Sequence, residues 1–181
     1  MRGNKPSSKG FIISPGLRNS EDELLILDNF WEIQMGEQKR IGIIGTSRLS
    51  EDHQQMIELL SYALVLSGNH VFTSGGGNGT NIAVIRGALR ACNPDLLTVI
   101  LPQSLISQPD DMQLLLARVV NLVQQPCNND LDLKTAANLC NLKILESVDK
   151  VLAFAYHDSE TVLSSVDAVQ DIMQVTKFYL D

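Results

Sequence analysis

Glycine is concentrated in one stretch of this sequence, Ser74-Gly-Gly-Gly-Asn-Gly-Thr80, where four of five consecutive residues are glycine. Residues without a Cβ let backbone N–H groups approach a bound anion, and a helix that begins there adds its positive end. The stretch therefore predicts a cradle for a phosphate or a carboxylate. It is not a Walker A loop, because no Gly-Lys-Ser/Thr follows, and it lacks the acidic residue of the dinucleotide fingerprint. A tight strand-to-helix turn is the alternative interpretation.

Two further segments carry side chains suited to the same ligand. Gly45-Thr-Ser-Arg48 follows an apolar strand, and its hydroxyls and guanidinium can bind phosphate oxygens. Asn141 lies in the helix before the fifth predicted strand, where its amide suits a sugar or a base, although a capping or surface role is an equal alternative. An ordinary turn with a surface arginine is the alternative for the first segment. The predicted phosphate- or nucleotide-binding residues are Gly45, Thr46, Ser47, Arg48, Ser74, Gly75, Gly76, Gly77, Asn78, Gly79, Thr80 and Asn141.

Residues for catalysis are harder to find. His157 stands beside Asp158 at the end of a predicted strand, but adjacent strand residues point to opposite faces, which disfavours a catalytic dyad. His53 and His70 have no evident partner in the sequence and are interpreted as structural or exposed. The sequence contains no Ser-His-Asp arrangement, metal-ligand spacing or paired catalytic carboxylates. We therefore predict no catalytic residue, no metal and no cofactor.

Strands and helices alternate along the chain. Apolar strands are predicted over residues 40–45, 70–73, 97–101, 119–123, 150–156 and 175–180, and helices over 50–67, 80–91, 110–118, 131–147 and 159–173. Continuous apolar strands that alternate with helices indicate a parallel sheet buried on both faces. The prediction is a Rossmann-like, doubly wound α/β fold with a mostly parallel sheet and helices on both faces. Ligands bind such sheets at the carboxyl ends of the strands, where the binding segments above fall.

Charge separates the chain into parts. The whole chain has 14 basic and 21 acidic residues and a formal net charge of −7. Residues 1–19 are predicted to be a flexible basic N-terminal arm, residues 20–38 an N-terminal helix with an apolar stripe, and residues 39–181 a single domain. From residue 41 onward the chain holds 8 basic and 15 acidic residues. This acidic body opposes non-specific binding to nucleic acid.

The cysteines and the apolar runs indicate the cellular compartment in which the protein is expected. Cys92, Cys127 and Cys140 are widely spaced, which predicts neither a zinc site nor a disulfide framework. We expect three reduced thiols, each a small buried apolar side chain. No apolar run approaches the ~20 residues of a membrane span, and the N-terminus lacks the apolar core of a signal peptide. The expectation is a cytoplasmic protein without membrane association.

Two stretches, Ile41-Gly-Ile-Ile-Gly-Thr-Ser-Arg48 and Ser74-Gly-Gly-Gly-Asn-Gly-Thr-Asn-Ile-Ala-Val-Ile-Arg-Gly-Ala-Leu89, resemble the DNA-processing protein A (DprA/Smf) family. That family carries G-S-R after its first strand and S-G-x-A-x-G-I-D-x-x-A-H-x-G-A-L after its second. The positions that match the second motif and a later R-N-x-x-I segment are Ser74, Gly75, Gly79, the run Gly87-Ala-Leu89, Asn141 and Ile144. The resemblance spans residues 40–156. It implies a Rossmann-like domain, binding of single-stranded DNA, a homodimer and delivery of DNA to a RecA-type recombinase.

The chain departs from the family pattern at several polar positions. The arginine in the glycine loop, the aspartate, the histidine and the arginine before the asparagine are replaced by Asn78, Asn81, Ile85 and Cys140, respectively. The chain also resembles the LONELY GUY (LOG) phosphoribohydrolases of the same superfamily, whose motif is P-G-G-x-G-T-x-x-E. Gly76-Gly-Asn-Gly-Thr80 fits the centre of that motif, but Ala83 stands where the catalytic glutamate belongs. Hydrolase activity of this type is therefore disfavoured.

Three functional hypotheses follow. The favoured one is a DprA-like recombination mediator that binds the phosphates of single-stranded DNA or of a nucleotide through the glycine-rich loop, without catalysis. The second is a sensor or regulatory module for a small nucleotide. The third, least favoured, is a LOG-like hydrolase of nucleoside monophosphates. The expected partners are a nucleotide or single-stranded DNA, a second copy of the chain and a RecA-type recombinase.

Overall fold

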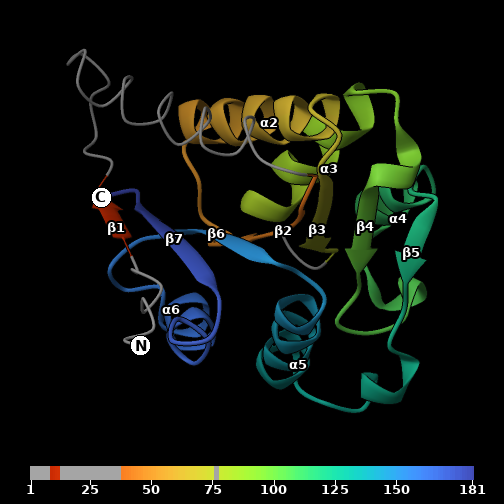
Figure 1. The fold of residues 1–181 in the computed structure, drawn as a ribbon. Helices are drawn as coiled ribbons and strands as arrows, with labels where there is room; N and C mark the ends of the chain where they lie inside the picture. The colour runs from red at the N-terminus through yellow and green to blue at the C-terminus, as the bar shows by residue number, and fades with distance from the viewer. Residues whose placement is uncertain (1–8, 13–37, 76–77) are drawn as a thin grey trace.

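A parallel sheet forms the centre of the protein (Figure 1). The computed structural model describes residues 9–12, 38–75 and 78–181. The strands are β1 (Lys9–Ile12), β2 (Arg40–Gly45), β3 (His70–Ser74), β4 (Leu97–Ile100), β5 (Asn121–Val123), β6 (Lys150–Ala155) and β7 (Gln174–Tyr179). They form one seven-stranded sheet in the order β1-β7-β6-β2-β3-β4-β5, and every neighbouring pair is parallel.

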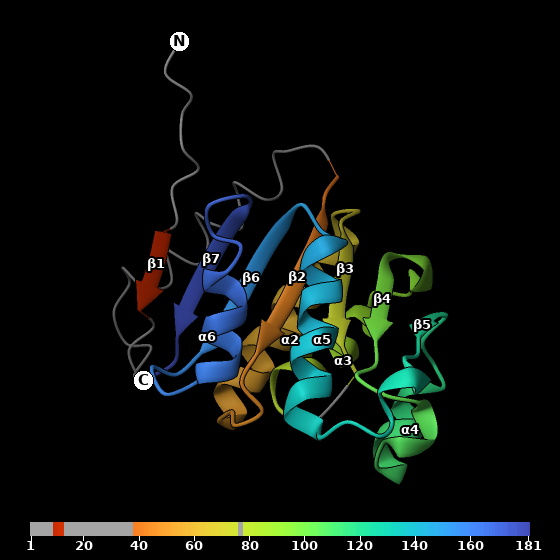
Figure 2. The same ribbon diagram turned by 90° about the horizontal axis from the view of Figure 1, so that it is seen from below.

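Helices cover both faces of this sheet (Figures 1 and 2). They are α2 (Glu51–Leu66), α3 (Thr80–Arg90), α4 (Asp110–Leu116), α5 (Leu133–Glu146) and α6 (Glu160–Asp167), with 3-10 turns at η1 (Pro94–Leu96), η2 (Leu105–Ser107) and η3 (Pro126–Asn128). Helices α2 and α3 lie on one face, and α5 and α6 lie on the other. The predicted Rossmann-like, doubly wound fold is confirmed.

The strand order reverses next to β2. From β2 the chain moves outward through β3 and β4 to β5, and then returns to the other side of β2 to form β6 and β7. Right-handed crossovers in the two directions place their helices on opposite faces of the sheet. Because the loops that follow β2 and β6 diverge to opposite faces, a crevice forms at the carboxyl ends of these two strands. This is where the fold positions a ligand.

Apolar side chains fill the space on both sides of the sheet. All six residues of β6 are buried, as expected of a strand covered on both faces. One apolar cluster contains Ile43, together with Phe154 and Phe178, whose rings stack with centroids 4.8 Å apart. The other contains Ile44 and Val151 and packs with residues of α5 and α6. Successive residues of β2 therefore contribute to opposite faces of one continuous core.

The structure differs from the sequence predictions in two segments. Residues 9–12, placed in the predicted flexible arm over 1–19, form β1 and pair with β7, which supplies backbone partners at the edge of the sheet. The predicted helix over 20–38 lies outside the described residues, apart from Gln38, which is not helical. The predicted helix over 159–173 is wrong after Asp167, because residues 168–173 form tighter turns. None of the described helices is long and apolar enough to cross a membrane.

Helices α2 and α3 approach each other closely at Gly87. A Cβ built on this glycine would lie 2.0 Å from the carbonyl oxygen of Glu58 on α2, far inside a permitted contact. The obstacle is backbone, so a side-chain rotation cannot relieve the clash. The matched glycine of the Gly87-Ala-Leu89 run is thus explained by helix packing.

We predict that Gly87→Ala destabilises the protein despite the better helix propensity of alanine. The two helices must separate to admit the methyl group, at a cost of about 2 kcal/mol in the free energy of unfolding. Urea denaturation followed by circular dichroism measures this difference. Arg86→Ala is the control, because Arg86 is exposed on the same helix; its free energy of unfolding should stay within about 0.5 kcal/mol of the wild type. Equal stability of Gly87→Ala and the wild type would contradict the packing argument.

Candidate functional site

A cleft of about 650 Å³ opens at the carboxyl ends of β2 and β3, bounded by α5 and by the start of α6. Its walls combine the loop after β2, the loop after β6 and the first turns of two helices. The lining residues are Gly45, Thr46, Ser47, Arg48, Ser74, Asn81, Leu133, Lys134, Ala137, Asn141, Asp158, Ser159, Glu160, Thr161 and Val162. The cleft therefore occupies the crevice where the strand order reverses.

The backbone of Thr46 fixes the loop after β2. Its N–H donates to the carbonyl of Phe154 on β6 at 2.8 Å, which extends the pairing of the two strands. Its carbonyl accepts two hydrogen bonds from Thr80 at the start of α3, from the N–H at 3.1 Å and from the hydroxyl at 3.0 Å. The hydroxyl of Thr46 accepts the N–H of Arg48 at 3.2 Å. Thr46 thus connects the loop after β2 to strand β6 and to the start of helix α3.

Two glycines permit this close approach. A Cβ on Gly45 would lie 2.4 Å from the hydroxyl oxygen of Thr80 and 2.6 Å from the carbonyl oxygen of Phe154. Gly79 has a φ of +76°, and a Cβ there would lie 2.5 Å from the carbonyl oxygen of Ser47. The loops after β2 and β3 are therefore in backbone contact, which only glycine at these positions allows.

Gly75, the first glycine of the glycine-rich stretch, packs closely against a neighbouring side chain. The N–H of Gly75 donates to the carbonyl of Ile100 at 2.9 Å, and a Cβ on Gly75 would lie 2.0 Å from a methyl carbon of Leu101. Gly76 and Gly77 lie outside the described residues. The tight-turn interpretation therefore gives a sufficient reason for glycine at Gly79, where the φ is positive and the obstacle is backbone, whereas at Gly75 the obstacle is the end of a leucine side chain.

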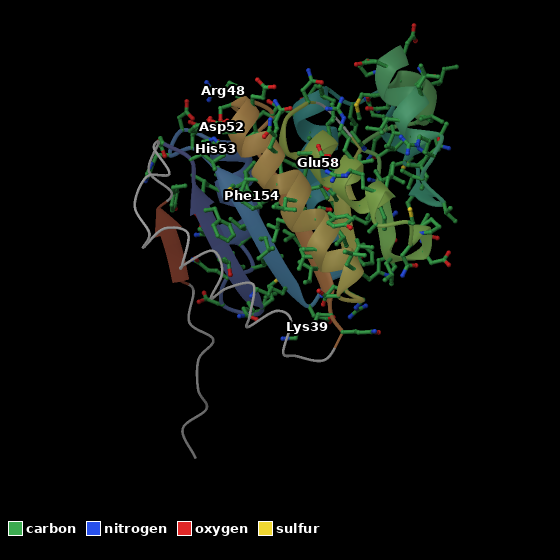
Figure 3. The ribbon with its side chains drawn as sticks, turned by 90° about the horizontal axis from the view of Figure 1, so that it is seen from above. Lys39, Arg48, Asp52, His53, Glu58 and Phe154 are labelled. Atoms are coloured by element: carbon green, nitrogen blue, oxygen red, sulfur yellow. The ribbon has the colours of Figure 1, made fainter. Side chains whose placement is uncertain are left out.

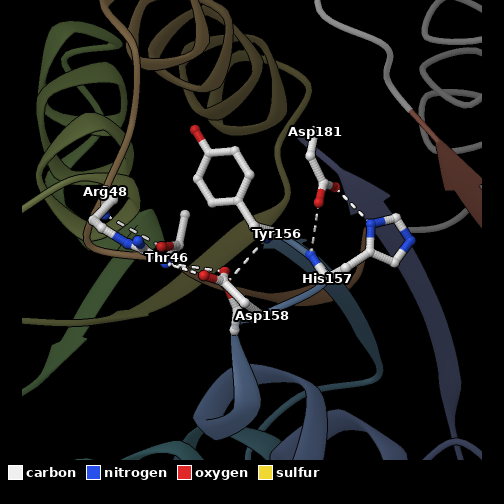
Figure 4. Close-up of polar contacts among 7 residues, drawn as sticks. Thr46, Arg48, Tyr156, His157, Asp158 and Asp181 are labelled. Atoms are coloured by element: carbon white, nitrogen blue, oxygen red, sulfur yellow. Dashed lines mark hydrogen bonds and ion pairs between the residues drawn. The ribbon is translucent and has the colours of Figure 1, made fainter.

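Arg48 is paired with Asp158 across the mouth of the crevice (Figure 4). One guanidinium nitrogen, Nη2, donates to both carboxylate oxygens of Asp158, at 2.9 and 2.8 Å. The hydrogen bonds and the charge of Asp158 raise the pKa of Arg48, so the arginine is cationic at all working pH values. Its Cζ lies 5.9 Å from the ring centroid of Tyr156, within range of a cation–π contact. Figure 3 shows Arg48 beside the start of α2, near Asp52 and His53.

The start of α6 borders the cleft. Ser159 precedes the helix, but its hydroxyl accepts the N–H of Tyr156 at 3.0 Å and does not cap α6. The N–H groups of Ser159 and Glu160 donate to the carbonyls of Tyr156 and Asp158 at 2.9 and 3.0 Å. The next two residues, Thr161 and Val162, also line the cleft, so the positive end of the helix borders it through them. Backbone N–H groups at such a helix end are suited to an anion.

Asn141 forms part of the wall between α5 and α6. It is buried, and its amide nitrogen donates to the hydroxyl of Ser165 on α6 at 3.4 Å. The Ser165 hydroxyl in turn donates to the carbonyl of Thr161 at 2.8 Å. Asn141 therefore connects the two helices on this face as well as lining the cleft.

Opposite charges balance within the cleft. Arg48 and Lys134 are its basic residues, and Asp158 and Glu160 are its acidic ones. Any anion that binds here meets two carboxylates as well as two cations. The site is thus less basic than a surface built to follow a polyphosphate chain.

The structure brings part of the predicted site together and leaves part of it apart. Gly45, Thr46, Ser47, Arg48, Ser74 and Asn141 line the cleft. Gly75, Gly79, Thr80 and the exposed Asn78 are described but do not line it. Thr80 is fully buried, and its hydroxyl is occupied by the carbonyl of Thr46. Its predicted contact with phosphate has no support in this geometry.

Several lining residues were absent from the predicted set. They are Asn81, Leu133, Lys134, Ala137 and the run 158–162. The sequence held a signal for the last of these, because a helix that follows a parallel strand begins at the ligand-binding edge of the sheet. The same rule applies to Lys134, in the first turn of the helix that follows β5.

His157 faces away from the cleft. Its Nδ1 lies 2.7 Å from a carboxylate oxygen of Asp181 (Figure 4). Its ring stacks on that of Tyr179. Asp158 pairs with Arg48, and both His157 and Asp158 lie in the turn after β6. His70 contacts the hydroxyl of Thr98 at 2.8 Å. The adjacent His157 and Asp158 therefore form no dyad.

The cysteines differ from one another in environment. All three are free thiols, but Cys92 and Cys127 are exposed, so the predicted burial is wrong for these two. Both belong to short connections that water reaches, next to a helix end and in a 3-10 turn. Cys140 is buried, and its thiol lies 3.1 Å from the carbonyl oxygen of Ile100. Burial raises its pKa to about 11.

We predict that only two thiols of the folded protein react with Ellman's reagent. Cys92 and Cys127 are accessible, whereas Cys140 is buried and protonated near neutral pH, so it should react only after denaturation. Absorbance titration at pH 8 with and without guanidinium counts the thiols. The Cys92→Ser/Cys127→Ser variant isolates Cys140 and should show almost no reaction when folded. A rapid reaction of this variant under native conditions would contradict the assigned burial.

Within the described residues, no group of three or more His, Cys, Asp or Glu side chains is placed to hold a metal ion. His53 is buried at the start of α2, where burial lowers its pKa, and its Nδ1 has no hydrogen-bond partner. His53 does not line the cleft. The polar chemistry of the cleft therefore rests on its side chains and backbone N–H groups.

Several solved structures share the arrangement described above. DNA processing protein A from Helicobacter pylori, whose single-stranded DNA binding mode has been studied structurally, superposes with a TM-score of 0.58 at 19% identity, over 80% of this chain and 67% of that one. DNA processing protein A from Streptococcus pneumoniae gives a TM-score of 0.57 at 17% identity, over 81% of this chain and 51% of that one. The Moco carrier protein of Chlamydomonas gives 0.51 at 18% identity, over 79% and 77%.

These likenesses establish the fold. The chain matches no protein-family model and no curated protein sequence. It spans about half the length of the Streptococcus pneumoniae protein. The predicted resemblance to the DprA family is matched by two structural neighbours of that name. Their sequence identities of 19% and 17% support a shared fold.

Proposed function

We propose that the cleft binds the phosphate group of a nucleotide, either free or within single-stranded DNA, and performs no chemistry on it. The observation that carries this proposal is the cationic Arg48 at the crevice between β2 and β6, where Ser47 and the uncapped start of α6 line the same space. A guanidinium and helix N-terminal N–H groups together provide the donors that a phosphate requires.

Two structural neighbours support a ligand of this class. The DprA of Helicobacter pylori is described by its binding of single-stranded DNA, which makes a DNA strand one candidate for this chain. The Moco carrier protein is named for a cofactor that it carries, which makes a small ligand the other. A homodimer, a RecA-type partner and a cytoplasmic location belong to the first candidate and stay proposals.

The charge of the cleft favours the small ligand. Asp158 and Glu160 offset Arg48 and Lys134, and the body of the chain is acidic. A DNA strand presents a phosphate at every nucleotide, so it requires a basic path that extends beyond a single site. A free nucleotide needs only one phosphate site and a neighbouring space for its sugar and base. A volume of about 650 Å³ lies within the usual range for small-molecule sites.

Glycosidic hydrolysis is a weaker candidate. Ala83, at the position of the glutamate in the LOG motif, is buried in α3 and cannot activate a water molecule. Asp158 and Glu160 supply carboxylates to the cleft, but neither stands at the position of the motif's glutamate in α3. A general base needs a free carboxylate near the reacting carbon. We therefore retain binding without catalysis.

We predict that Arg48→Ala weakens the binding of AMP by about tenfold, because a charge-assisted contact with the phosphate is lost. Isothermal titration calorimetry measures the dissociation constant. Arg90→Ala is a matched control: Arg90 is exposed, pairs with Glu58 at 2.8 Å and lies over the ring of Tyr62, but lies outside the cleft. Both variants remove one positive charge, so a general electrostatic effect would lower both affinities.

A second measurement separates the two ligand classes. Fluorescence anisotropy of a labelled single-stranded oligonucleotide, at low and physiological salt and with AMP as competitor, distinguishes a strand from a free nucleotide. Tight binding that falls steeply with salt supports the DNA strand. Failure of both ligands to bind the wild-type protein, or equal affinities of Arg48→Ala and Arg90→Ala, would reject the proposed phosphate site.

A further inference from the structure

Arg48, the arginine best placed to bind an anion in the cleft, is already paired with the carboxylate of Asp158. Arg48 and Asp158 come from the loops after β2 and β6, on either side of the crevice, and they meet through two hydrogen bonds of 2.9 and 2.8 Å. Both side chains are about two-thirds exposed, so the pair can open without disturbing the core. A phosphate that binds Arg48 must compete with the carboxylate of Asp158.

Opening the pair leaves an unfavourable arrangement. The released carboxylate of Asp158 stays beside the bound phosphate, and Glu160 lies in the same cleft. Like charges at such distances repel, and each additional phosphate of the ligand increases the repulsion. The ligand that binds best is therefore one that compensates Asp158 as well as Arg48.

A carboxylate is compensated by hydrogen-bond donors. Ionised Asp158 accepts hydrogen bonds but cannot donate them, and hydroxyl groups are suitable partners. A ribonucleoside monophosphate presents one phosphate and, within the same small molecule, the two adjacent hydroxyls of its ribose. A deoxyribonucleotide lacks one of these hydroxyls, and a DNA strand lacks it at every position while adding further phosphates.

We propose that Asp158 determines the specificity of the cleft: it holds Arg48 in the absence of ligand and selects ribonucleoside monophosphates by accepting hydrogen bonds from their ribose hydroxyls. The proposal rests on the phosphate-binding function above and names the ligand class of the same site. The proposal gives Asp158 two opposite effects on binding. Asp158 lowers the affinity for a bare phosphate and raises the preference for ribose over deoxyribose.

Substitution of Asp158 by asparagine tests both contributions. Asp158→Asn keeps the size of the side chain and removes its charge, so the affinity for inorganic phosphate should rise by about fivefold, a modest factor because the pair is exposed. The preference of the wild-type protein for AMP over dAMP should fall toward unity in the variant. Calorimetric titration of phosphate, AMP and dAMP against each protein measures these ratios.

Asp149→Asn is the matched control. Asp149 forms the equivalent pair with Arg40 at 2.8 Å, at the amino ends of β2 and β6, whereas the cleft lies at the carboxyl ends of the strands. Asp149→Asn removes the same charge by the same substitution as Asp158→Asn, but away from the cleft. It should therefore change neither the phosphate affinity nor the AMP-to-dAMP ratio. Thermal melting of both variants confirms that each is folded.

The outcomes separate the two proposals. An unchanged phosphate affinity and AMP-to-dAMP ratio in Asp158→Asn overturns the role of Asp158 while the phosphate site stands. Equal binding of AMP and dAMP by the wild-type protein, or stronger binding of a single-stranded oligonucleotide than of AMP, also overturns it and needs no variant. If neither the wild-type protein nor Asp158→Asn binds phosphate or any nucleotide, both proposals fail.

Discussion

The backbone of Thr46 is the constraint on which the site depends. Its N–H continues the pairing of β2 with β6, and its carbonyl receives both donors of Thr80 at the start of α3. This double attachment draws the loop after β2 against the loop after β3, so that Gly45 and Gly79 have no room for a Cβ. The position of Arg48 follows, because its own N–H is held by the Thr46 hydroxyl.

The fold was largely readable from the sequence because each strand is a short apolar run between turn or capping residues. The strand predicted over 40–45 is β2, and the strand predicted over 150–156 is β6, which is buried throughout. The failures are local. β1 was missed because its short run lies among Gly, Pro and Ser residues, and its stability comes from a partner at the other end of the chain.

The site was readable only in part. Segments that follow strands were identified, since the carboxyl edge of a parallel sheet gathers them whatever the rest of the topology. The pairing of Arg48 with Asp158 was not, because it joins residues 110 positions apart. That contact exists only because β6 inserts beside β2, which apolar patterning does not specify. Nor does the sequence say that the hydroxyl of Thr80 turns toward a carbonyl instead of the cleft.

Matched glycines in this chain do not by themselves identify the ligand. Gly75, Gly79 and Gly87 match the family pattern, and a Cβ at each would meet a methyl carbon of Leu101, the backbone of Ser47 and the backbone of Glu58, respectively. At Gly79 and Gly87 the obstacle is backbone, so packing alone suffices to maintain these two matches, whatever the ligand. Information about the ligand resides instead in side chains that packing leaves free to vary, above all the exposed pair of Arg48 and Asp158. A cation opposed by a carboxylate favours a ligand that presents an anion and hydrogen-bond donors together, and it disfavours a chain of phosphates.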